Sequence, residues 1–450
     1  MKEQTLTRGN ILHSLLKFAV PVLLALFLQA MYGAADLIIV GKFAGTSEQS
    51  GVATGSQLFN LVTMAVTGLS MGITVFVGNT IGAGDKERAG QGIGTGIFIF
   101  GVLALIVTVP IVAGSEFLSA VMHAPESAFS ATNSYIRICG IGTIFIVAYN
   151  LFGAIFRGVG DSATPLITVA IACAINIGGD LLLVGAFGMG AAGAAVATVA
   201  AQAVSVAVSF LLICKKALPF CFCRRSLRPR ADHAKQILLV GIPIALQEIL
   251  VQLSFLFIQV IVNEMGVVAS AAVGVAEKVC IFLMLVSSAY MQSVSAFVAQ
   301  NNGARLTQRS SKALLCSIST ALIAGIAMSL LALFGGALLS SVFSNEQAVI
   351  TAAHSYLKAY AIDCLLTSVL FCFIGYFNGC KHTIFVMIQG VAGAFFVRIP
   401  VVYLMSRMDE ATLFLIGLGT PVSSAVQIIL CLAALLYFRK KEKNKEERLA

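Results

Sequence analysis

Long apolar runs separated by short polar gaps dominate this chain. Most runs hold enough consecutive residues with few charges for an α-helix to cross the hydrocarbon core of a bilayer, which takes about 20 residues. Read with a window of that length, the pattern predicts an all-α membrane protein with twelve transmembrane helices. The predicted spans cover residues 14–38, 51–80, 92–114, 132–156, 164–186, 191–214, 236–262, 269–300, 312–336, 352–378, 384–405 and 412–438.

One gap is longer and more polar than the others, and it separates the sixth predicted span from the seventh. It suggests that the chain consists of two six-helix lobes and a linker. The predicted parts are an N-terminal lobe (1–214), a basic cytoplasmic linker (215–235), a C-terminal lobe (236–438) and a basic cytoplasmic tail (439–450).

The two halves resemble each other in sequence. LLKFAVPVLLAL matches ILLVGIPIALQE, which pairs Pro21 with Pro243, and FVGNTIGAGDKER matches FVAQNNGARLTQR at nearly the same spacing. Because each unit holds an even number of spans, the two units have the same orientation and form pseudo-symmetric parallel repeats. Transporters built in this way place the substrate site at the repeat interface, near the midplane of the membrane.

The distribution of basic residues predicts the topology. Most of the 29 Lys and Arg residues fall in the N-terminal segment, in alternate loops, in the linker and in the C-terminal tail. Cytoplasmic loops carry such an excess of Lys and Arg. We therefore expect a multi-pass protein of the inner or plasma membrane, with both termini in the cytoplasm.

Composition excludes several classes of protein. The chain is 58% hydrophobic and 11% charged, with a mean hydropathy of +0.95, whereas a soluble domain is about 25% charged. A net charge of +9 does not indicate nucleic-acid binding, because the basic residues are spread over short gaps instead of forming one patch. The eleven cysteines lie mostly inside apolar runs and suggest no disulfide framework.

Motifs for enzymatic chemistry are absent from the sequence. Cys221, Cys223 and His233 lie in the basic linker, but their spacing fits no common zinc pattern. No phosphate-binding G-x-x-x-x-G-K-[ST] loop occurs, and no nucleophile–base pair is evident. We expect no enzyme and no cofactor, so that any uphill transport must draw on a gradient of H+ or Na+.

Two acids in apolar runs of the N-terminal half are the strongest candidates for function. An acid at membrane depth costs about 2.5–3.5 kcal/mol on insertion scales, so Asp36 and Asp180 should face protein or water. Asn176 and Asp180 are four residues apart and share a helix face. A carboxyl group in a water-poor pocket takes up a proton more readily than in water. Such a group can hold a proton, a sodium ion or an organic cation in turn, although a permanently neutralised acid is the alternative.

The C-terminal half also carries acids within its apolar runs. Glu248 and Asp363 could form a second acidic site. Glu277 stands beside Lys278, and the simpler interpretation is that this neighbour neutralises it.

Two prolines and one tyrosine add to the picture. Pro21 and Pro243 lie inside apolar runs, where each removes a helix hydrogen bond and permits a bend. That bend is either a static kink or a hinge that differs between two states. Tyr32 precedes Asp36 by one turn and is a candidate for lining a pocket.

Four segments carry a resemblance to a known family. They are MYGAADLIIVGKFAG (31–45), GLSMGITVFVGNTIGAGDKERA (68–89), FRGVGDSATPL (156–166) and INIGGDLLLVGAFGMGAAGAAVATVAAQ (175–202). Together they resemble the multidrug and toxic compound extrusion (MATE) family, and the similarity extends over essentially the whole chain. The resemblance implies a V-shaped exporter with two lobes, which exchanges external protons or sodium for small organic, often cationic, compounds. We expect it to work as a monomer in the lipid bilayer.

The resemblance also implies roles for individual residues. Asp36 looks like the acid of the family's first helix, whose protonation is proposed to bend that helix and expel the substrate. Asn176, Asp180 and Thr198 look like its partners in a cation site, which in some members holds Na+. Other members rely on acids in the seventh and tenth helices, and Glu248 and Asp363 lie near those places.

Two other functions remain open from the sequence. One is a lipid-linked oligosaccharide flippase of the same superfamily, which should line its groove with basic residues for pyrophosphate; away from the ends of the predicted spans, the basic residues are only Lys278 and Arg398. The other is a passive channel or receptor, which paired repeats with buried acids do not favour.

Overall fold

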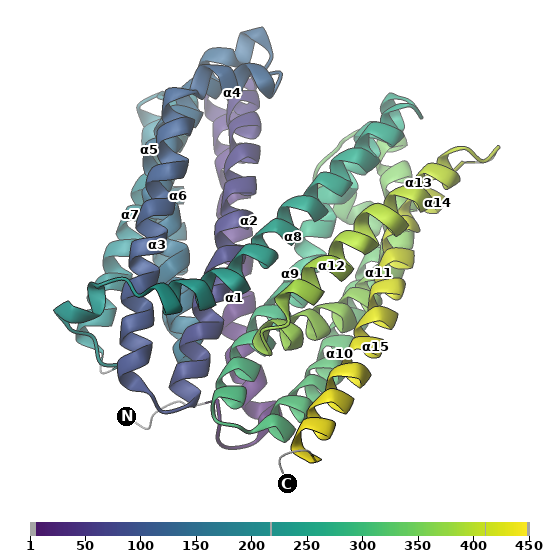
Figure 1. Cartoon of the computed structure of the whole chain (residues 1–450). Coiled ribbons are helices and arrows are strands. Elements are labelled where there is room, and N and C mark those ends of the chain that lie inside the picture. Colours follow the sequence, from purple (N-terminus) through teal and green to yellow (C-terminus); the bar gives the residue numbers. More distant parts are fainter. Residues whose placement is uncertain (1–5, 217, 410, 448–450) are drawn as a thin grey trace. The chain divides into compact units, whose positions relative to one another are not determined.

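The computed structural model describes residues 6–216, 218–409 and 411–447, and every regular element in these ranges is a helix (Figure 1). Within them, twelve helices are long and apolar enough to cross a membrane. The prediction of twelve spans is therefore confirmed. Most of the helices extend beyond the predicted spans because they continue into polar residues that the hydropathy window leaves out.

The first half of the chain contains seven α-helices and two short irregular helices. They are α1 (Ile11–Phe43), α2 (Thr46–Gly82), α3 (Lys86–Ala113), α4 (Ser115–Val121), the 3-10 turn η1 (Glu126–Ala128), α5 (Phe129–Val159), α6 (Ala163–Asp180), the π-helical segment η2 (Leu181–Ala186) and α7 (Gly190–Lys215).

The second half repeats this pattern, with its own π-helical segment near the end. Its elements are the 3-10 turn η3 (Arg224–Leu227), α8 (Ala231–Asn263), α9 (Val267–Gly303), α10 (Thr307–Ser341), α11 (Gln347–Gly379), α12 (Thr383–Ala392), the π-helical segment η4 (Gly393–Arg398), α13 (Ile399–Ser406), α14 (Leu413–Gly417) and α15 (Gly419–Glu447).

Packing divides the chain into two compact units. Unit 1 comprises Met1–Ala245 and Ala296–Thr307, and unit 2 comprises Leu246–Ser295 and Gln308–Ala450. The first part of α8, up to just beyond Pro243, and the last part of α9 thus pack with unit 1. The predicted lobe boundaries at the linker stay a prediction.

Unit 1 is organised around α2 and α5, which pack closely together. The end of α2 also meets the end of α9 at two glycines, Gly82 and Gly303. A Cβ atom at Gly82 would collide with the carbonyl of Gln300, and one at Gly303 would collide with the carbonyl of Asn79. Only glycine allows helix backbones to approach this closely, which explains the Gly-Ala pair shared by the two repeats.

The segment predicted as a linker is packed against α3. The backbone N–H of Cys221 donates to the carbonyl of Lys86 at 3.0 Å. A Cβ atom at Gly90 or Gly94 would collide with the backbone of this segment. The glycine run at the start of α3 therefore makes room for a chain segment, as close packing of small residues predicts.

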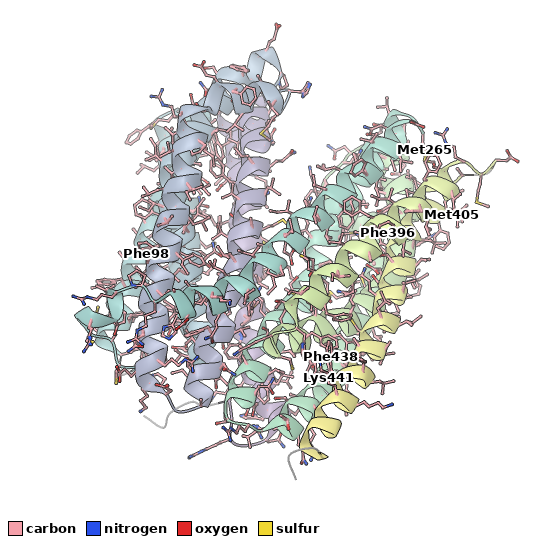
Figure 2. The ribbon with its side chains drawn as sticks, viewed as in Figure 1. Phe98, Met265, Phe396, Met405, Phe438 and Lys441 are labelled. Atoms are coloured by element: carbon pink, nitrogen blue, oxygen red, sulfur yellow. The ribbon has the colours of Figure 1, made fainter. Side chains whose placement is uncertain are left out.

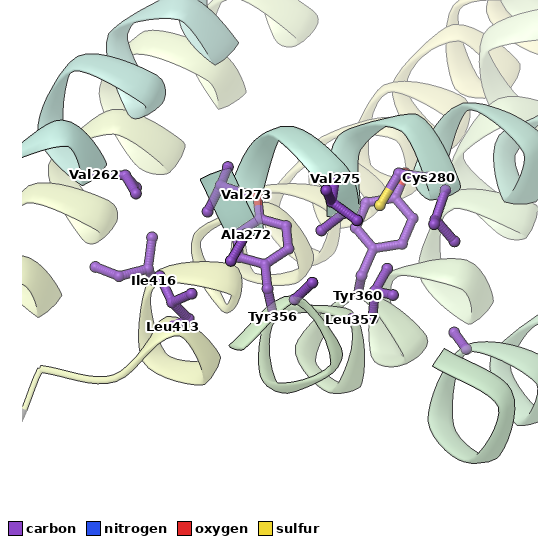
Figure 3. Close-up of a cluster of buried hydrophobic side chains, with 14 of the residues drawn as sticks. Val262, Ala272, Val273, Val275, Cys280, Tyr356, Leu357, Tyr360, Leu413 and Ile416 are labelled. Atoms are coloured by element: carbon purple, nitrogen blue, oxygen red, sulfur yellow. The ribbon is translucent and has the colours of Figure 1, made fainter. Parts of the chain in front are cut away.

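Unit 2 has its own core, built mainly from α8, α9 and α11 with α14. Figure 3 shows Tyr356 and Tyr360 beside Val273, Val275 and Cys280. Both tyrosines are almost completely buried. Unit 2 thus carries polar hydroxyl groups within an otherwise apolar core.

Many large apolar side chains point outward from the helices. Phe98 on α3 is 53% exposed and Phe396 in η4 is 79% exposed (Figure 2). Exposed apolar side chains along helices of this length match a lipid environment, in which helices satisfy their own backbone groups. The protein is a multi-pass membrane protein.

Candidate functional site

Three helices of unit 1 bring together the four residues predicted for the cation site. Asp36 lies on α1, Asn176 and Asp180 lie on α6, and Thr198 lies on α7. Helix α1 packs against both α6 and α7. Asp36, Asn176 and Asp180 are 4%, 1% and 0% exposed, whereas Thr198 is half-buried.

A short hydrogen-bond chain connects three of these residues. The Nδ2 group of Asn176 donates to Oγ1 of Thr198 at 3.3 Å. The hydroxyl of Thr198 in turn donates to Oδ2 of Asp36 at 3.2 Å. The amide leaves the hydroxyl proton free to point at the carboxylate, and a bond to a charged acceptor is among the stronger kinds.

The second acid, Asp180, interacts electrostatically with Asp36. No ion pair found in the described residues includes either carboxyl group. Two acids that face each other in a water-poor site without a basic partner repel each other when both are ionised. The pair therefore requires a proton or another cation.

Several oxygens of this site have no hydrogen-bond partner. They are Oδ1 of Asp36, Oδ1 of Asn176 and both carboxylate oxygens of Asp180. In the ionised form these atoms only accept hydrogen bonds, and oxygen acceptors are the ligands of hard cations. The donor set thus fits Na+ at Asp36, Asn176, Asp180 and Thr198, and it equally fits a proton held between the carboxyl groups.

The local sequence around Asp180 fixes the register of α7 against α6. Asp180 ends the α-helical part of α6, and η2 follows directly. Gly188 and Gly190 then adopt φ values of +66° and +56°, which favour glycine. The N–H of Ala191 donates to Oε2 of Glu48 at 2.7 Å, so α7 begins at a capped and rigid turn.

Tyr32 lies on α1, one turn before Asp36, and interacts with it electrostatically; its role in lining a pocket stays a prediction. Its side chain also neighbours those of Gln29 and Gln202. Sequence reasoning missed Tyr135 on α5, a buried tyrosine that interacts with Asp36 across the unit. The two residues lie on different helices, and helix periodicity alone does not predict which helices face each other.

The two predicted hinge prolines lie inside continuous helices. Pro21 is on α1, the helix that carries Asp36. Pro243 is on α8, just before the point where the chain passes from unit 1 to unit 2. The positions suit hinges, and the hinge role stays a prediction.

The predicted acidic pair of the C-terminal half is placed differently from that of unit 1. Asp363 on α11 is completely buried, whereas Glu248 on α8 is partly exposed. In the described part of unit 2, no interaction joins the two; Asp363 instead interacts with Arg398 and lies near Ser424. Arg398 was noted in the sequence only as a basic residue inside a span.

A known family model matches each half of the chain separately. The family model described as MatE matches residues 21–182 and residues 243–404. The chain is 26% identical to the probable multidrug resistance protein YoeA of Bacillus subtilis (strain 168), over 98% of this chain and 96% of that protein. It is 29% identical to the probable multidrug resistance protein YpnP of the same organism, over 98% and 97%.

Solved structures share the fold. The crystal structure of MATE in complex with MaL6 superposes with a TM-score of 0.92 at 20% identity, covering 98% of this chain and 100% of that one. An outward-facing multidrug resistance MATE family transporter of the MOP superfamily gives a TM-score of 0.91 at 20% identity, covering 98% and 99%.

Proposed function

The chain belongs to the MATE family of multidrug transporters, which are not enzymes and need no cofactor, and we propose that it exports small organic cations in exchange for H+ or Na+. Export by alternating access then uses the gradient of the coupling cation as its energy source. The YoeA and YpnP relatives, named as probable multidrug resistance proteins, support substrates of this class.

The paired acids of unit 1 are the observation that carries this proposal. A buried carboxylate without a counter-charge is costly by several kcal/mol, and Asp36 and Asp180 have no basic partner in the described ion pairs. Binding a cation relieves that cost. Because no basic side chain of the described residues forms an ion pair with either acid, we infer that an exchangeable cation from outside the protein supplies the positive charge.

Coupling requires that the cation favour one conformation over another. A ligand shifts a conformational equilibrium only by its differential affinity for the two states, and moving it from 1:99 to 99:1 takes about 5.5 kcal/mol. Loading the pair at Asp36 changes the charge carried by α1. Since Pro21 lies on the same helix, a bend at Pro21 would move Asp36 relative to α6 and couple occupancy to conformation.

Substrate and coupling cation are expected to use the same charge. An organic cation can pair with the Asp36 carboxylate and can also lie against the ring of Tyr32, since aromatic faces attract cations. A bound proton or Na+ removes that negative charge and so disfavours the substrate. Because the two compete for the same carboxylate, binding of the coupling cation accompanies release of the substrate.

Proteoliposomes provide the test, with proton and sodium gradients imposed separately and accumulation of a cationic dye as the readout. We expect one or both gradients to drive accumulation by the wild type. Asp36→Asn should abolish it at unchanged expression, whereas Glu116→Gln, an exposed acid on α4, should leave it intact. Gradient-driven transport by Asp36→Asn would refute the assignment.

The same assay separates the alternatives. A lipid-linked oligosaccharide flippase would move no dye under either gradient, and a passive channel would not concentrate the dye against its own gradient. We further expect a monomer whose termini both face the cytoplasm. Labelling of Cys221 and Cys223, which are exposed in the described structure, by a membrane-impermeant thiol reagent applied from the cytoplasmic side tests that orientation.

A further inference from the structure

Unit 2 contains a buried guanidinium held in one position by its neighbours. Arg398 ends η4 and is 6% exposed. Its Nη1 donates to the hydroxyl of Ser254 at 3.0 Å. Its Cζ atom lies 4.4 Å from the centre of the Phe255 ring. Stacking on an aromatic ring together with a directed hydrogen bond suits arginine and would not suit lysine equally well.

The acid that interacts with this guanidinium is Asp363. Both carboxylate oxygens of Asp363 are buried without a hydrogen-bond partner, and so is Nε of Arg398. The two groups interact electrostatically, although no direct ion pair joins them among the described residues. An arginine that interacts with an otherwise isolated buried carboxylate offsets its charge.

The register of the repeats places this arginine at an instructive position. At the spacing that separates the two stretches matched by the family model, Arg398 falls on Asn176 and its partner Ser254 falls on Tyr32. Unit 1 therefore has a neutral amide where unit 2 has a permanent positive charge. Arginine does not lose its proton in proteins, so this charge cannot be exchanged.

We propose that the Arg398 guanidinium is a permanent counter-cation for Asp363. It occupies in unit 2 the role that an exchangeable cation has in unit 1. It follows that Asp363 binds no exchangeable cation while Arg398 is in place. This inference rests on the proposed function, and it assigns Arg398 as the residue that sets the number of coupling cations.

The groups around Asp363 indicate what the arginine prevents. Glu277 and Asp363 both interact with Cys280 and with Tyr356, and the hydroxyl of Ser424 lies near Asp363. Figure 3 shows Tyr360 beside Cys280 in this core, with Tyr356 closer to Val273. Without the guanidinium, two acids and a hydroxyl would remain, which is the kind of oxygen set that unit 1 uses.

Cation counting on purified protein tests the proposal, with bound 22Na+ and proton uptake measured in parallel. We expect Arg398→Asn to gain one bound cation per chain over the wild type. Arg398→Lys, which keeps a positive charge, should show no gain, and the double variant Arg398→Asn with Asp363→Asn should return to the wild-type count.

A folded Arg398→Asn protein with an unchanged count would overturn the proposal. If that variant does not fold, Asp363→Asn in the wild-type background decides: the proposal requires an unchanged count, and loss of a cation contradicts it. Failure of the proposed function is distinguishable, because it would appear as an unchanged count in Asp36→Asn.

Discussion

The acids of the two units differ in the charge of their neighbours. In unit 1, Asp36 and Asp180 face each other beside neutral groups and leave several oxygens unpaired. In unit 2, Asp363 lies within electrostatic range of a guanidinium that is itself fixed by a hydroxyl and an aromatic ring. Two copies of one fold can therefore hold the same kind of buried charge in two ways, and only the first requires a cation from outside the protein.

Both units place a π-helical segment beside the charged residue. In unit 1, η2 follows Asp180, and in unit 2, η4 ends at Arg398. A π-helical turn frees backbone groups and is frequent at functional sites. The hydroxyl of Ser423 donates to the carbonyl of Gly393, the first residue of η4, at 2.7 Å. Similar backbone geometry thus supports opposite charges in the two halves.

The largest expected difference in transport is between two variants that each remove one acid, Asp180 in unit 1 and Asp363 in unit 2. Asp180→Asn should lower gradient-driven export at least about 100-fold, because it removes one of the two carboxylates that bind the coupling cation, and loss of even an outer partner of a cation ligand costs about 10–100-fold in affinity. Asp363→Asn should keep gradient-driven export. Dye accumulation in proteoliposomes checks both. Equal losses in the two variants would erase the distinction between the units.

A smaller effect is expected at the hydroxyl that supports Asp36. Thr198→Val removes the hydrogen bond to Asp36 while nearly preserving the shape of the side chain. Hydrogen bonds to charged groups are worth about 1.5–3 kcal/mol, so affinity for the coupling cation should change about tenfold or more, as measured by cation titration of the purified protein.

The matched control is Thr420→Val in unit 2, at the same repeat spacing as Thr198 and also buried. Because Arg398 already supplies the positive charge for Asp363, that variant should titrate like the wild type. A shift as large as that of Thr198→Val would show that unit 2 takes part in cation binding.

The smallest effect concerns the start of α6, outside the membrane spans. Asp161 accepts a hydrogen bond from the N–H of Thr164 at 3.0 Å and pairs with Lys216 at 2.9 Å. Burial alone would raise the pKa of Asp161, but the hydrogen bonds and the Lys216 charge outweigh it, so its pKa lies below the usual value. A lowered pKa contributes stability above the ordinary pKa of about 3.9, and the contribution is lost as the pH falls through the folded-state pKa.

Thermal unfolding in detergent at several pH values measures this contribution. Asp161→Asn should lower the unfolding temperature by a few degrees at neutral pH, for a loss of about 1 kcal/mol or less. The difference from the wild type should vanish at a pH well below 4. Asp409→Asn, an exposed acid of unit 2, should show no such pattern; a difference that persists in acid would contradict the charge argument.

Sequence alone predicted the helices well because the membrane imposes both length and apolarity on each span. It also selected Asp36, Asn176, Asp180 and Thr198, which the structure brings together. Here the polar residues are few, and the i to i+4 spacing placed two of them on one helix face.

The second unit was harder to predict because no i to i+4 spacing joins Asp363 on α11 to the residue that it interacts with, Arg398 in η4. Glu248 and Asp363 were paired in the sequence analysis by their half of the chain, yet Asp363 interacts with Arg398 instead. Likewise, Lys278 was expected to neutralise its neighbour Glu277. The Nζ atom of Lys278 instead lies 5.9 Å from the centre of the Phe343 ring. Which faces of distant helices meet depends on packing, and one sequence does not reveal it.

The account depends most on the claim that the acid pair of unit 1 holds an exchangeable cation in competition with substrate. Binding of tetraphenylphosphonium, a lipophilic organic cation, to the purified protein at increasing H+ or Na+ concentration measures this directly. The account predicts that affinity for it falls as the coupling cation rises, and that Asp36→Asn removes this dependence. An affinity that is independent of both cations in the wild type, or equally dependent on them in Asp36→Asn, would contradict it.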